Sequence, residues 1–292
     1  MSQLDDTMIG THPKVDLARS GFLVTSIATG FAAAVMPVSA ETISTDSSGL
    51  TAGEVKVPTR DGSTPAYRAM PVGKTRLPVV IVVQEIFGVH EHIKDLCRRL
   101  AKEGYFAVAP DLYARHGDPT QYPAAADIIA NVVSKVSGSE VLADLDATLA
   151  WAVSNGGNPD RVGITGFCWG GRQVWLYAAH SDRIKAGIAW YGPLAGTPTE
   201  NMPKFPVDIA KDLKAPVLGL YGGKDQGITA EHVEKMREAL KSVPAAAADS
   251  QIIIFPESGH GFNADYRPSY NEKDAKKAWA RMLAFLRQHG VG

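Results

Sequence analysis

The sequence predicts an α/β fold in which helices cover both faces of a mostly parallel sheet. Residues 78–83 (PVVIVV) are apolar at every position, which is typical of a strand buried on both faces of a parallel sheet. Short runs of this kind alternate along the chain with longer segments that have the apolar spacing of helices. Together these observations predict one α/β domain, which we place at residues 41–292.

The first part of this domain is predicted to open with a β-hairpin. Residues 54–57 and 65–69 flank a turn that contains Asp61 and Gly62. The predicted elements that follow are a strand at 78–83, a helix at 92–102, a strand at 106–110 and a helix at 140–153. The first of these helices stops before Gly104, a residue that commonly ends helices.

The second part repeats the alternation of strands and helices. We predict strands at 161–165, 186–191, 215–221 and 250–255, and helices at 171–179, 230–240 and 274–288. Residues 196–214 have no clear pattern and hold three prolines, so we expect a surface excursion there.

Composition and charge exclude several classes of protein. The 292 residues are 45% hydrophobic and 21% charged, as in ordinary globular proteins. The formal net charge is −1, so we expect no nucleic acid partner. We also expect no membrane span, because no stretch is long and purely apolar. The oligomeric state stays open between monomer and homodimer.

Residues 1–40 differ from the rest of the chain. Residues 21–36 are mildly apolar and precede Val38-Ser39-Ala40, a small-residue pattern typical of signal-peptidase cleavage. Arg19 precedes the apolar run, but Asp16 and the aspartates before it oppose a positively charged start. Two interpretations stay open, an export signal of a periplasmic protein or an N-terminal arm of a cytoplasmic one.

Residues 166–170 (GFCWG) place Cys168 between two glycines at a predicted junction of strand and helix. This spacing fits the elbow that holds a nucleophile on a sharp turn, with Cys where Ser is more common. The start of the following helix also favours a thiolate. The alternative interpretation of this motif alone is a buried structural cysteine in a glycine-rich loop.

Two further residues follow later predicted strands. Asp225 comes after the strand at 215–221, and His260 comes after the strand at 250–255. The order nucleophile, acid, base, with each residue after a strand, is that of α/β-hydrolase triads. Because parallel strands end at the same edge of a sheet, we expect Cys168, Asp225 and His260 to form a catalytic triad.

With these motifs the chain resembles the dienelactone hydrolase (carboxymethylenebutenolidase) family, a branch of the α/β-hydrolase fold with a cysteine nucleophile. The resemblance covers about residues 53–290. The segments that carry it are 83–88 (VQEIFG), 109–115 (APDLYAR), 222–225 (GGKD), 258–262 (SGHGF) and the elbow. It implies a hydrolase that cleaves a lactone or ester through a thioester intermediate, with no cofactor and no metal.

The resemblance also implies roles for individual residues. Cys168 would be the nucleophile, His260 the general base and Asp225 the acid that orients it. Glu85 matches a glutamate that takes up the thiol proton when substrate binds. Glu85 as a helix N-terminal cap is the alternative interpretation.

Further residues are expected to bind the reacting group or the substrate. The backbone N–H groups of Ile86 and Trp169 would form the oxyanion hole. Arg115 matches an arginine that holds the substrate carboxylate, which favours an anionic substrate. The alternative for Arg115 is a solvated loop charge in a surface ion pair. Tyr113 is a candidate for the lining of the substrate pocket.

The sequence departs from the family pattern at one position. Ala264 stands four residues after His260, where the family has a second substrate-binding arginine. Arg267, three residues further on, is the candidate to replace it. If Arg267 does not reach the same space, dienelactone becomes doubtful as the natural substrate.

Three other functions use or keep the same residues. A broad-specificity carboxylesterase or thioesterase would use the same triad on other substrates. An acyl transferase would pass the acyl group to another acceptor. A non-catalytic binding protein would keep the fold, although the presence of all three triad residues argues against it.

Some residues are assigned no role in the reaction. Cys97 lies at an apolar-facing position of a predicted helix, so we expect core packing. His90-Glu91-His92 lacks a third clustered ligand, so we expect no zinc site. Trp169, Tyr191 and Phe262 stay open between pocket lining and plain core, as does Tyr113.

Overall fold

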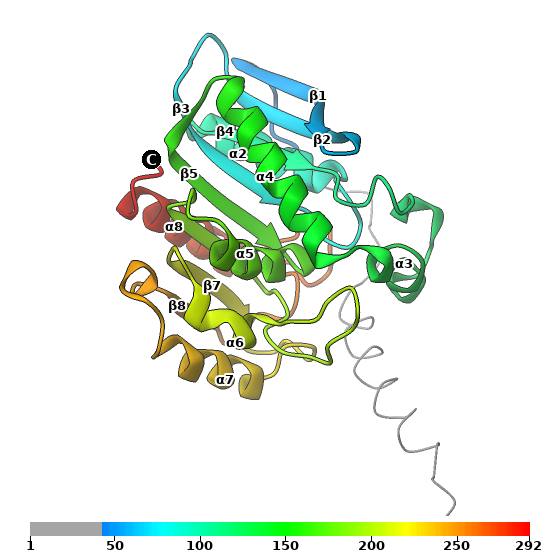
Figure 1. The fold of residues 1–292 in the computed structure, drawn as a ribbon, viewed down its shortest axis with the longest axis vertical. Helices are drawn as coiled ribbons and strands as arrows, with labels where there is room; N and C mark the ends of the chain where they lie inside the picture. The colour runs from blue at the N-terminus through cyan, green and yellow to red at the C-terminus, as the bar shows by residue number, and fades with distance from the viewer. Residues whose placement is uncertain (1–42) are drawn as a thin grey trace, which may run out of the picture.

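A computed structural model describes residues 43–292, which form an eight-stranded sheet with helices packed on it (Figure 1). The prediction for residues 1–40 concerns a segment outside this range. The strands are β1 (Leu50–Thr59), β2 (Gly62–Pro71), β3 (Leu77–Val83), β4 (Phe106–Pro110), β5 (Gly157–Phe167), β6 (Ala186–Trp190), β7 (Val217–Gly222) and β8 (Gln251–Phe255). The helices are α2 (Glu91–Lys102), α3 (Ala125–Asn131), α4 (Gly138–Ser154), α5 (Trp169–His180), α6 (Pro206–Ile209), α7 (Ala230–Leu240) and α8 (Glu272–Gln288).

The sheet is mostly parallel, in the order β1-β2-β4-β3-β5-β6-β7-β8. β1 and β2 pair as the predicted hairpin, with Thr59 opposite Gly62, and β2 pairs antiparallel with β4. From β4 to β8 every neighbouring pair is parallel. The predicted fold class is therefore confirmed.

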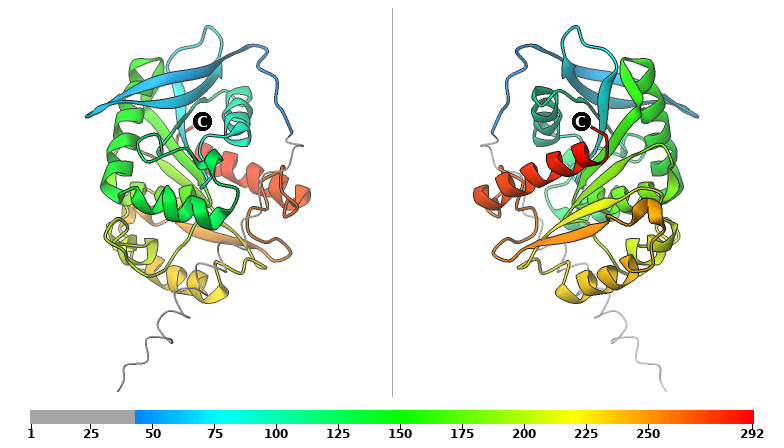
Figure 2. Two further views of the ribbon diagram at one scale, coloured as in Figure 1. Left: turned by 90° about the vertical axis from the view of Figure 1, so that its right-hand side faces the viewer. Right: turned by 90° about the vertical axis from the view of Figure 1, so that its left-hand side faces the viewer.

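Helices lie on both faces of this sheet. α2 and α8 cover one face, and α4 and α5 cover the other (Figures 1 and 2). The central strand β3 is enclosed between these layers, and its residues 79–83 are fully buried. Burial on both faces explains why this strand is apolar at every position rather than at alternate ones.

The parallel strands present their C-terminal ends at one edge of the sheet. Glu85 follows β3, Cys168 follows β5, and Tyr191 follows β6. Asp225 and His260 follow β7 and β8 in the same way. The fold therefore brings to one edge several chemically active residues that are far apart in the sequence.

The surface excursion predicted at 196–214 contains a short helix. α6 begins at Pro206, and a single 3-10 turn over residues 210–212 follows it. The Asp208 carboxylate accepts a hydrogen bond of 2.8 Å from the Phe205 N–H, which stabilises the start of the helix. Proline is well tolerated at the first helical position, so Pro206 starts an element here.

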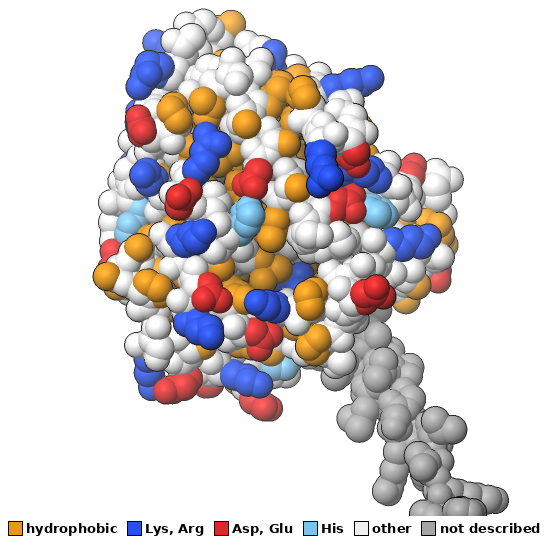
Figure 3. All heavy atoms as spheres, viewed as in Figure 1, with side chains coloured by type: hydrophobic (Ala, Val, Ile, Leu, Met, Phe, Trp, Pro, Cys, Tyr) orange, Lys and Arg blue, Asp and Glu red, His pale blue; other side chains and the backbone are white. Residues whose placement is uncertain are grey.

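Residues 43–292 contain neither a membrane-spanning helix nor a cluster of metal ligands. No helix in this part of the chain combines the length and the apolarity needed to cross a membrane. No group of three or more His, Cys, Asp or Glu side chains within it is arranged to hold a metal ion. On the face shown in Figure 3, basic and acidic side chains are interspersed rather than gathered by sign.

Candidate active site

The elbow at Cys168 depends on glycines that allow close contact. Cys168 has φ 56° and ψ −120°, a backbone conformation that side chains rarely adopt. A Cβ on Gly166 would lie 2.4 Å from the Gly170 carbonyl oxygen. A Cβ on Gly170 would lie 2.5 Å from the carbonyl oxygens of Val83 and Gln84. Any larger residue at either position would push α5 away from β3 and β5.

The same contact brings the start of α5 to the end of β3. Trp169 is the first residue of α5, so its N–H has no acceptor within the helix. Because Gly170 touches Gln84, the Trp169 backbone lies beside the segment that contains Glu85 and Ile86. The two backbone N–H groups expected to form an oxyanion hole therefore belong to adjoining segments next to Cys168.

His260 and Asp225 form a buried hydrogen-bonded pair. The Nδ1 atom of His260 lies 2.8 Å from Oδ2 of Asp225, and both side chains are almost fully buried. The other Asp225 oxygen accepts hydrogen bonds from the backbone N–H groups of Gly227 (2.9 Å) and Ile228 (3.1 Å). The carboxylate is thus fixed, and it fixes the orientation of the imidazole in turn.

The opposite side of the imidazole interacts with Cys168. Burial alone would lower the pKa of His260, but the charges of Asp225 and Cys168 and the hydrogen bonds to both residues outweigh it and raise this pKa to about 10. His260 therefore interacts with Asp225 and with Cys168 at once.

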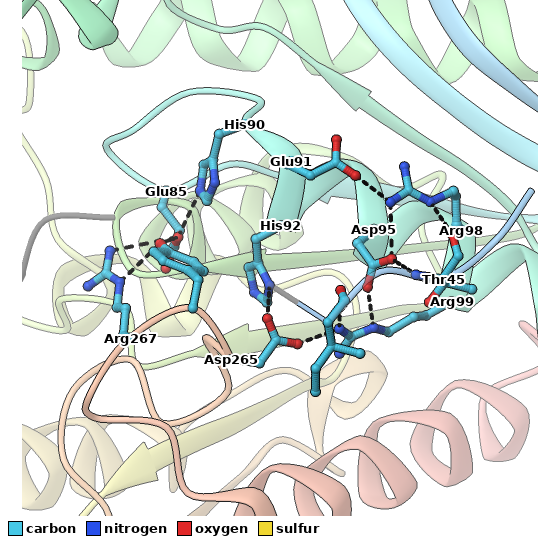
Figure 4. A network of polar contacts seen from close by, with 12 residues as sticks. Thr45, Glu85, His90, Glu91, His92, Asp95, Arg98, Arg99, Asp265 and Arg267 are labelled. Atoms are coloured by element: carbon cyan, nitrogen blue, oxygen red, sulfur yellow. Dashed lines mark hydrogen bonds and ion pairs between the residues drawn. The ribbon is translucent and has the colours of Figure 1, made fainter. Parts of the chain in front are cut away.

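Glu85 is a fully buried carboxylate held by three side chains (Figure 4). It accepts a short hydrogen bond from the Tyr266 hydroxyl and another of 3.2 Å from Nε2 of His90. Nη2 of Arg267 lies 3.8 Å away. Burial alone would raise the pKa of Glu85, but Arg267 and His90 outweigh it and lower this pKa far below the usual range. Glu85 is therefore ionised and is held on the Arg267 side of the site.

Arg267 lies in the same group and is itself buried, with 4% of its surface exposed. Its guanidinium carbon lies 4.7 Å from the centre of the Phe87 ring and 5.1 Å from that of Tyr266. Nε donates to the Tyr266 oxygen at 3.0 Å, while Nη1 has no acceptor among residues 43–292. Burial lowers the pKa of Arg267 and the charge of Glu85 raises it, with a net increase, so the side chain is a cation with a spare donor.

A second polar network fixes the turn that carries Tyr266 and Arg267 (Figure 4). Asp265 in this turn bonds Nδ1 of His92 at 3.2 Å and makes a short ion pair with Arg99. Arg99 also binds Asp95 at 2.5 Å, and Asp95 accepts a short hydrogen bond from the Thr45 N–H. The turn is thereby tied to α2 and, through Asp95, to the segment that precedes β1.

Arg115 is not brought to this group. Its guanidinium makes two hydrogen bonds with Asp144, at 2.6 and 2.9 Å. Glu140 lies 3.1 Å away on the same helix, and Asp61 lies 2.9 Å away in the β1–β2 turn. Its charge is therefore already balanced in ion pairs, which is the alternative that the sequence left open for this residue.

Three of the candidate aromatic residues lie beside Cys168 or His260. The Tyr113 and Trp169 rings lie 5.0 Å apart, and the Tyr191 and His260 rings lie 5.2 Å apart. Tyr191 has φ 36°, so two consecutive strands, β5 and β6, are each followed by a residue in this rare backbone region. Phe262 contacts the Tyr191 ring at 5.5 Å and extends the aromatic cluster into the core.

Two residues of the site were not predicted from the sequence. Tyr266 was not considered, and His90 was weighed only as a metal ligand, yet both bind Glu85. Tyr266 is 181 residues away from Glu85, so no local spacing could have predicted the contact. The signal that was available for Tyr266 is its position beside Arg267, the residue expected to compensate for Ala264.

Comparisons with known proteins agree on one family. The model of the "Dienelactone hydrolase family" matches residues 64–290. A protein of Methylorubrum extorquens named "Putative carboxymethylenebutenolidase" is 54% identical over the full length of both chains. One of Escherichia coli K12 with the same name is 52% identical and covers 92% of this chain and 98% of its own.

A solved structure supports the same conclusion. The crystal structure titled as a putative dienelactone hydrolase from Klebsiella pneumoniae is 55% identical, with a TM-score of 0.79, and covers 82% of this chain and 99% of its own. The chain therefore belongs to the dienelactone hydrolase family and is a hydrolase with the α/β-hydrolase fold.

Proposed function

We propose that this hydrolase cleaves the lactone or ester bond of a small anionic substrate through a Cys168-His260-Asp225 triad. The observation that carries the proposal is the position of His260, which bonds Asp225 at 2.8 Å and interacts with Cys168 on its other side. A base held between an acid and a nucleophile is the arrangement that activates a thiol for attack.

The reaction then runs through a thioester. When the substrate binds, Glu85 takes up the proton of the Cys168 thiol, and the Cys168 thiolate attacks the carbonyl carbon of the substrate. The carbon–oxygen bond breaks, and the leaving oxygen takes the proton from His260. A water molecule next loses a proton to His260 and attacks the thioester. Cys168 leaves as a thiolate and takes its proton back from Glu85, and the acid product is released.

The negative charge that develops on the carbonyl oxygen must be stabilised by hydrogen-bond donors. The backbone N–H groups of Trp169 and Ile86 are assigned this role, because the contact of Gly170 with Gln84 brings their segments together. In comparable enzymes each such donor lowers the barrier by about 3–4 kcal/mol.

Arg267 is assigned the substrate carboxylate in place of Arg115. Arg267 is a buried cation with an N–H group that has no acceptor among the described residues, whereas Arg115 is already bound by Asp144. A carboxylate at Arg267 would compete with Glu85 for its charge. Glu85 would then be free to turn toward Cys168 and take up its proton.

The test is hydrolysis of dienelactone and of a neutral p-nitrophenyl ester by the wild type, Cys168→Ala and Cys97→Ala. We expect turnover of dienelactone that disappears in Cys168→Ala and persists in Cys97→Ala. Turnover of the neutral ester alone, again lost only in Cys168→Ala, would keep the triad and replace the substrate. Equal activity of the wild type and Cys168→Ala would refute the proposed nucleophile.

Thiol labelling provides an independent check. Cys97 is fully buried in α2, and burial raises the pKa of its thiol far above the usual range. A small substrate-like alkylating reagent should therefore modify Cys168 much faster than Cys97 in the folded protein, as measured by mass spectrometry of peptides. Equal rates for the two cysteines would contradict the activation of Cys168 by His260.

A further inference from the structure

Arg172 is a buried arginine that the proposed reaction does not use. It lies on α5 four residues after Cys168, and 3% of its surface is exposed. Its Nη2 donates a short hydrogen bond to the backbone oxygen of Lys204, and its guanidinium carbon lies 4.9 Å from the centre of the Phe205 ring. Its Nε and Nη1 atoms have no acceptor among residues 43–292.

Two other arginines among the described residues, by contrast, have carboxylate partners. Arg98 lies 3.1 Å from Asp95, and Arg115 lies 2.6 Å from Asp144. Within the described residues no carboxylate lies within 4.0 Å of Arg172. Burial lowers the pKa of Arg172 to about 10, and the more distant Asp208 offsets only part of that effect. A buried cation without a counter-ion is unfavourable unless an anion binds it.

The position of Arg172 relates it to the nucleophile. Four residues of helix place it about 6 Å along α5 from Cys168, at the same edge of the sheet. The loop that follows β6 lies against this turn of α5, because a Cβ on Gly192 would be 2.3 Å from the Arg172 backbone nitrogen. Arg172 is therefore enclosed between α5 and the segment that contains Lys204 and Phe205.

Arg267 lies on the opposite side of Cys168. It contacts Glu85 after β3, and it comes from the segment just before α8, on the α2 and α8 side of the sheet (Figure 2). Arg172 belongs to α5 on the other side, next to the β6 loop. Since β3 and β6 are the two neighbours of β5, the two arginines flank the strand that carries the nucleophile.

We propose that Arg172 binds a second acidic group of the substrate, so that the enzyme acts on a molecule with anionic groups on both sides of the scissile bond. This inference rests on the proposed function, in which Arg267 takes the first carboxylate. The two free N–H groups of Arg172 supply the donors, and its missing counter-ion supplies the electrostatic preference. A carboxylate and a phosphoryl group share the chemistry that this site recognises.

Binding measured by calorimetry tests the inference without depending on turnover. The ligands are straight-chain dicarboxylates from succinate to adipate, ω-phosphonocarboxylates of the same lengths, and the matching monocarboxylates. We expect at least one doubly anionic ligand to bind the wild type about tenfold or more tightly than its monocarboxylate. In Arg172→Gln this advantage should disappear, while the affinity for the monocarboxylate stays the same.

Two further variants control for charge and folding. Arg172→Lys keeps the positive charge and should retain part of the advantage, which also covers the case in which Arg172→Gln does not fold. Arg183→Gln removes an exposed arginine just after α5 and should change nothing. The inference is overturned if no doubly anionic ligand is preferred by the wild type, or if the folded Arg172→Gln protein keeps the preference.

The two proposals fail in different ways. Loss of the preference for two anions in Arg172→Gln, together with ester turnover lost in Cys168→Ala, supports both. Ester turnover that depends on Cys168 without any preference for two anions refutes only the role of Arg172. Binding that depends on Arg172 in a protein whose turnover ignores Cys168 refutes only the proposed nucleophile.

Discussion

At the scale of single residues, the backbone of Cys168 stores strain. Its φ of 56° and ψ of −120° lie in a backbone region that is sterically unfavourable for every residue except glycine. The surrounding contacts of Gly166 and Gly170 leave the turn no alternative conformation. The sulfur is thereby held at the end of β5, at a cost in stability to the folded protein.

This strain predicts that Cys168→Gly is more stable than Cys168→Ala. Both variants lack the sulfur, but only glycine relieves the unfavourable φ, so we expect a difference of about 1–3 kcal/mol in the free energy of unfolding. Urea unfolding followed by circular dichroism measures it. A Cys168→Ala protein that is the more stable of the two would show that the backbone is not strained.

The pKa of His260 should depend on its two partners in a fixed order. Asp225 and Cys168 both raise this pKa, and Asp225 has the larger effect. We expect the pKa to decrease from the wild type to Cys168→Ala and further to Asp225→Asn. NMR titration of the imidazole, assigned with His260→Gln, measures the order. An unchanged pKa in Asp225→Asn would contradict the pairing of these residues.

The same shift makes stability depend on pH. The pKa of His260 is raised in the folded protein from 6.5 to about 10, so its protonated form stabilises the fold fully below pH 6.5. That stabilisation is lost as the pH rises toward 10. The difference in unfolding free energy between the wild type and His260→Gln should therefore shrink between pH 6 and pH 10. A difference that stays constant over this range would contradict the stabilisation by protonated His260.

At the scale of elements, the contact between α5 and the end of β3 brings together the two segments of the proposed oxyanion hole. Gly170→Ala would place a methyl group 2.5 Å from two carbonyl oxygens, whereas Gly259→Ala would meet nothing closer than 3.9 Å. We expect Gly170→Ala to lose about 1–3 kcal/mol of stability and most of the activity. Gly259→Ala is the control for stability, and equal thermal melting of the two variants would contradict this account.

The link between α2 and the turn at Asp265 is a second contact between elements. Arg99→Gln removes ion pairs with the buried carboxylates of Asp95 and Asp265, so we expect a loss of about 2 kcal/mol. Lys94→Gln removes a pair with the exposed Glu54 and a contact of 5.7 Å with the Tyr67 ring, and should cost less than about 1 kcal/mol. Chemical denaturation of both variants tests the difference.

The sequence predicted the elements better than the contacts between them. The strands and the elbow have local signatures, namely uniform apolar runs and glycines around Cys168, because burial and close packing act on those residues directly. The partners of Glu85 have no such signature, since Tyr266 and His90 reach it only after the sheet has formed. For Arg115 the family motif predicted a substrate-binding residue. A motif specifies the residue type alone, so it could not reveal the carboxylates that bind this arginine.

At the scale of the whole molecule, the segment before β1 is part of the folded domain. The Thr45 carbonyl accepts a hydrogen bond of 2.7 Å from Nε of Arg98, and the Ser48 carbonyl accepts one of 2.8 Å from Lys102. Together with the bond from Thr45 N–H to Asp95, these contacts fasten residues 45–48 along α2.

A chain that begins at residue 49 should therefore be less stable than one that begins at residue 43. Truncation leaves the buried Asp95 and Arg98 without backbone partners, so we expect a loss of about 1–3 kcal/mol. Unfolding in urea of the two truncated chains measures this directly. Equal urea midpoints of unfolding would show that the contacts of residues 45–48 with α2 do not stabilise the domain.

The distribution of the proposed triad along the chain has a consequence for loss of activity. Cys168, Asp225 and His260 come from the ends of three strands, and His260 belongs to the last of them, at the edge of the sheet. If His260 is the base, a molecule in which β8 has detached lacks it even while the other strands remain paired. Activity therefore requires that the sheet is paired as far as β8. Loss of activity during mild denaturation would then detect the detachment of this edge strand.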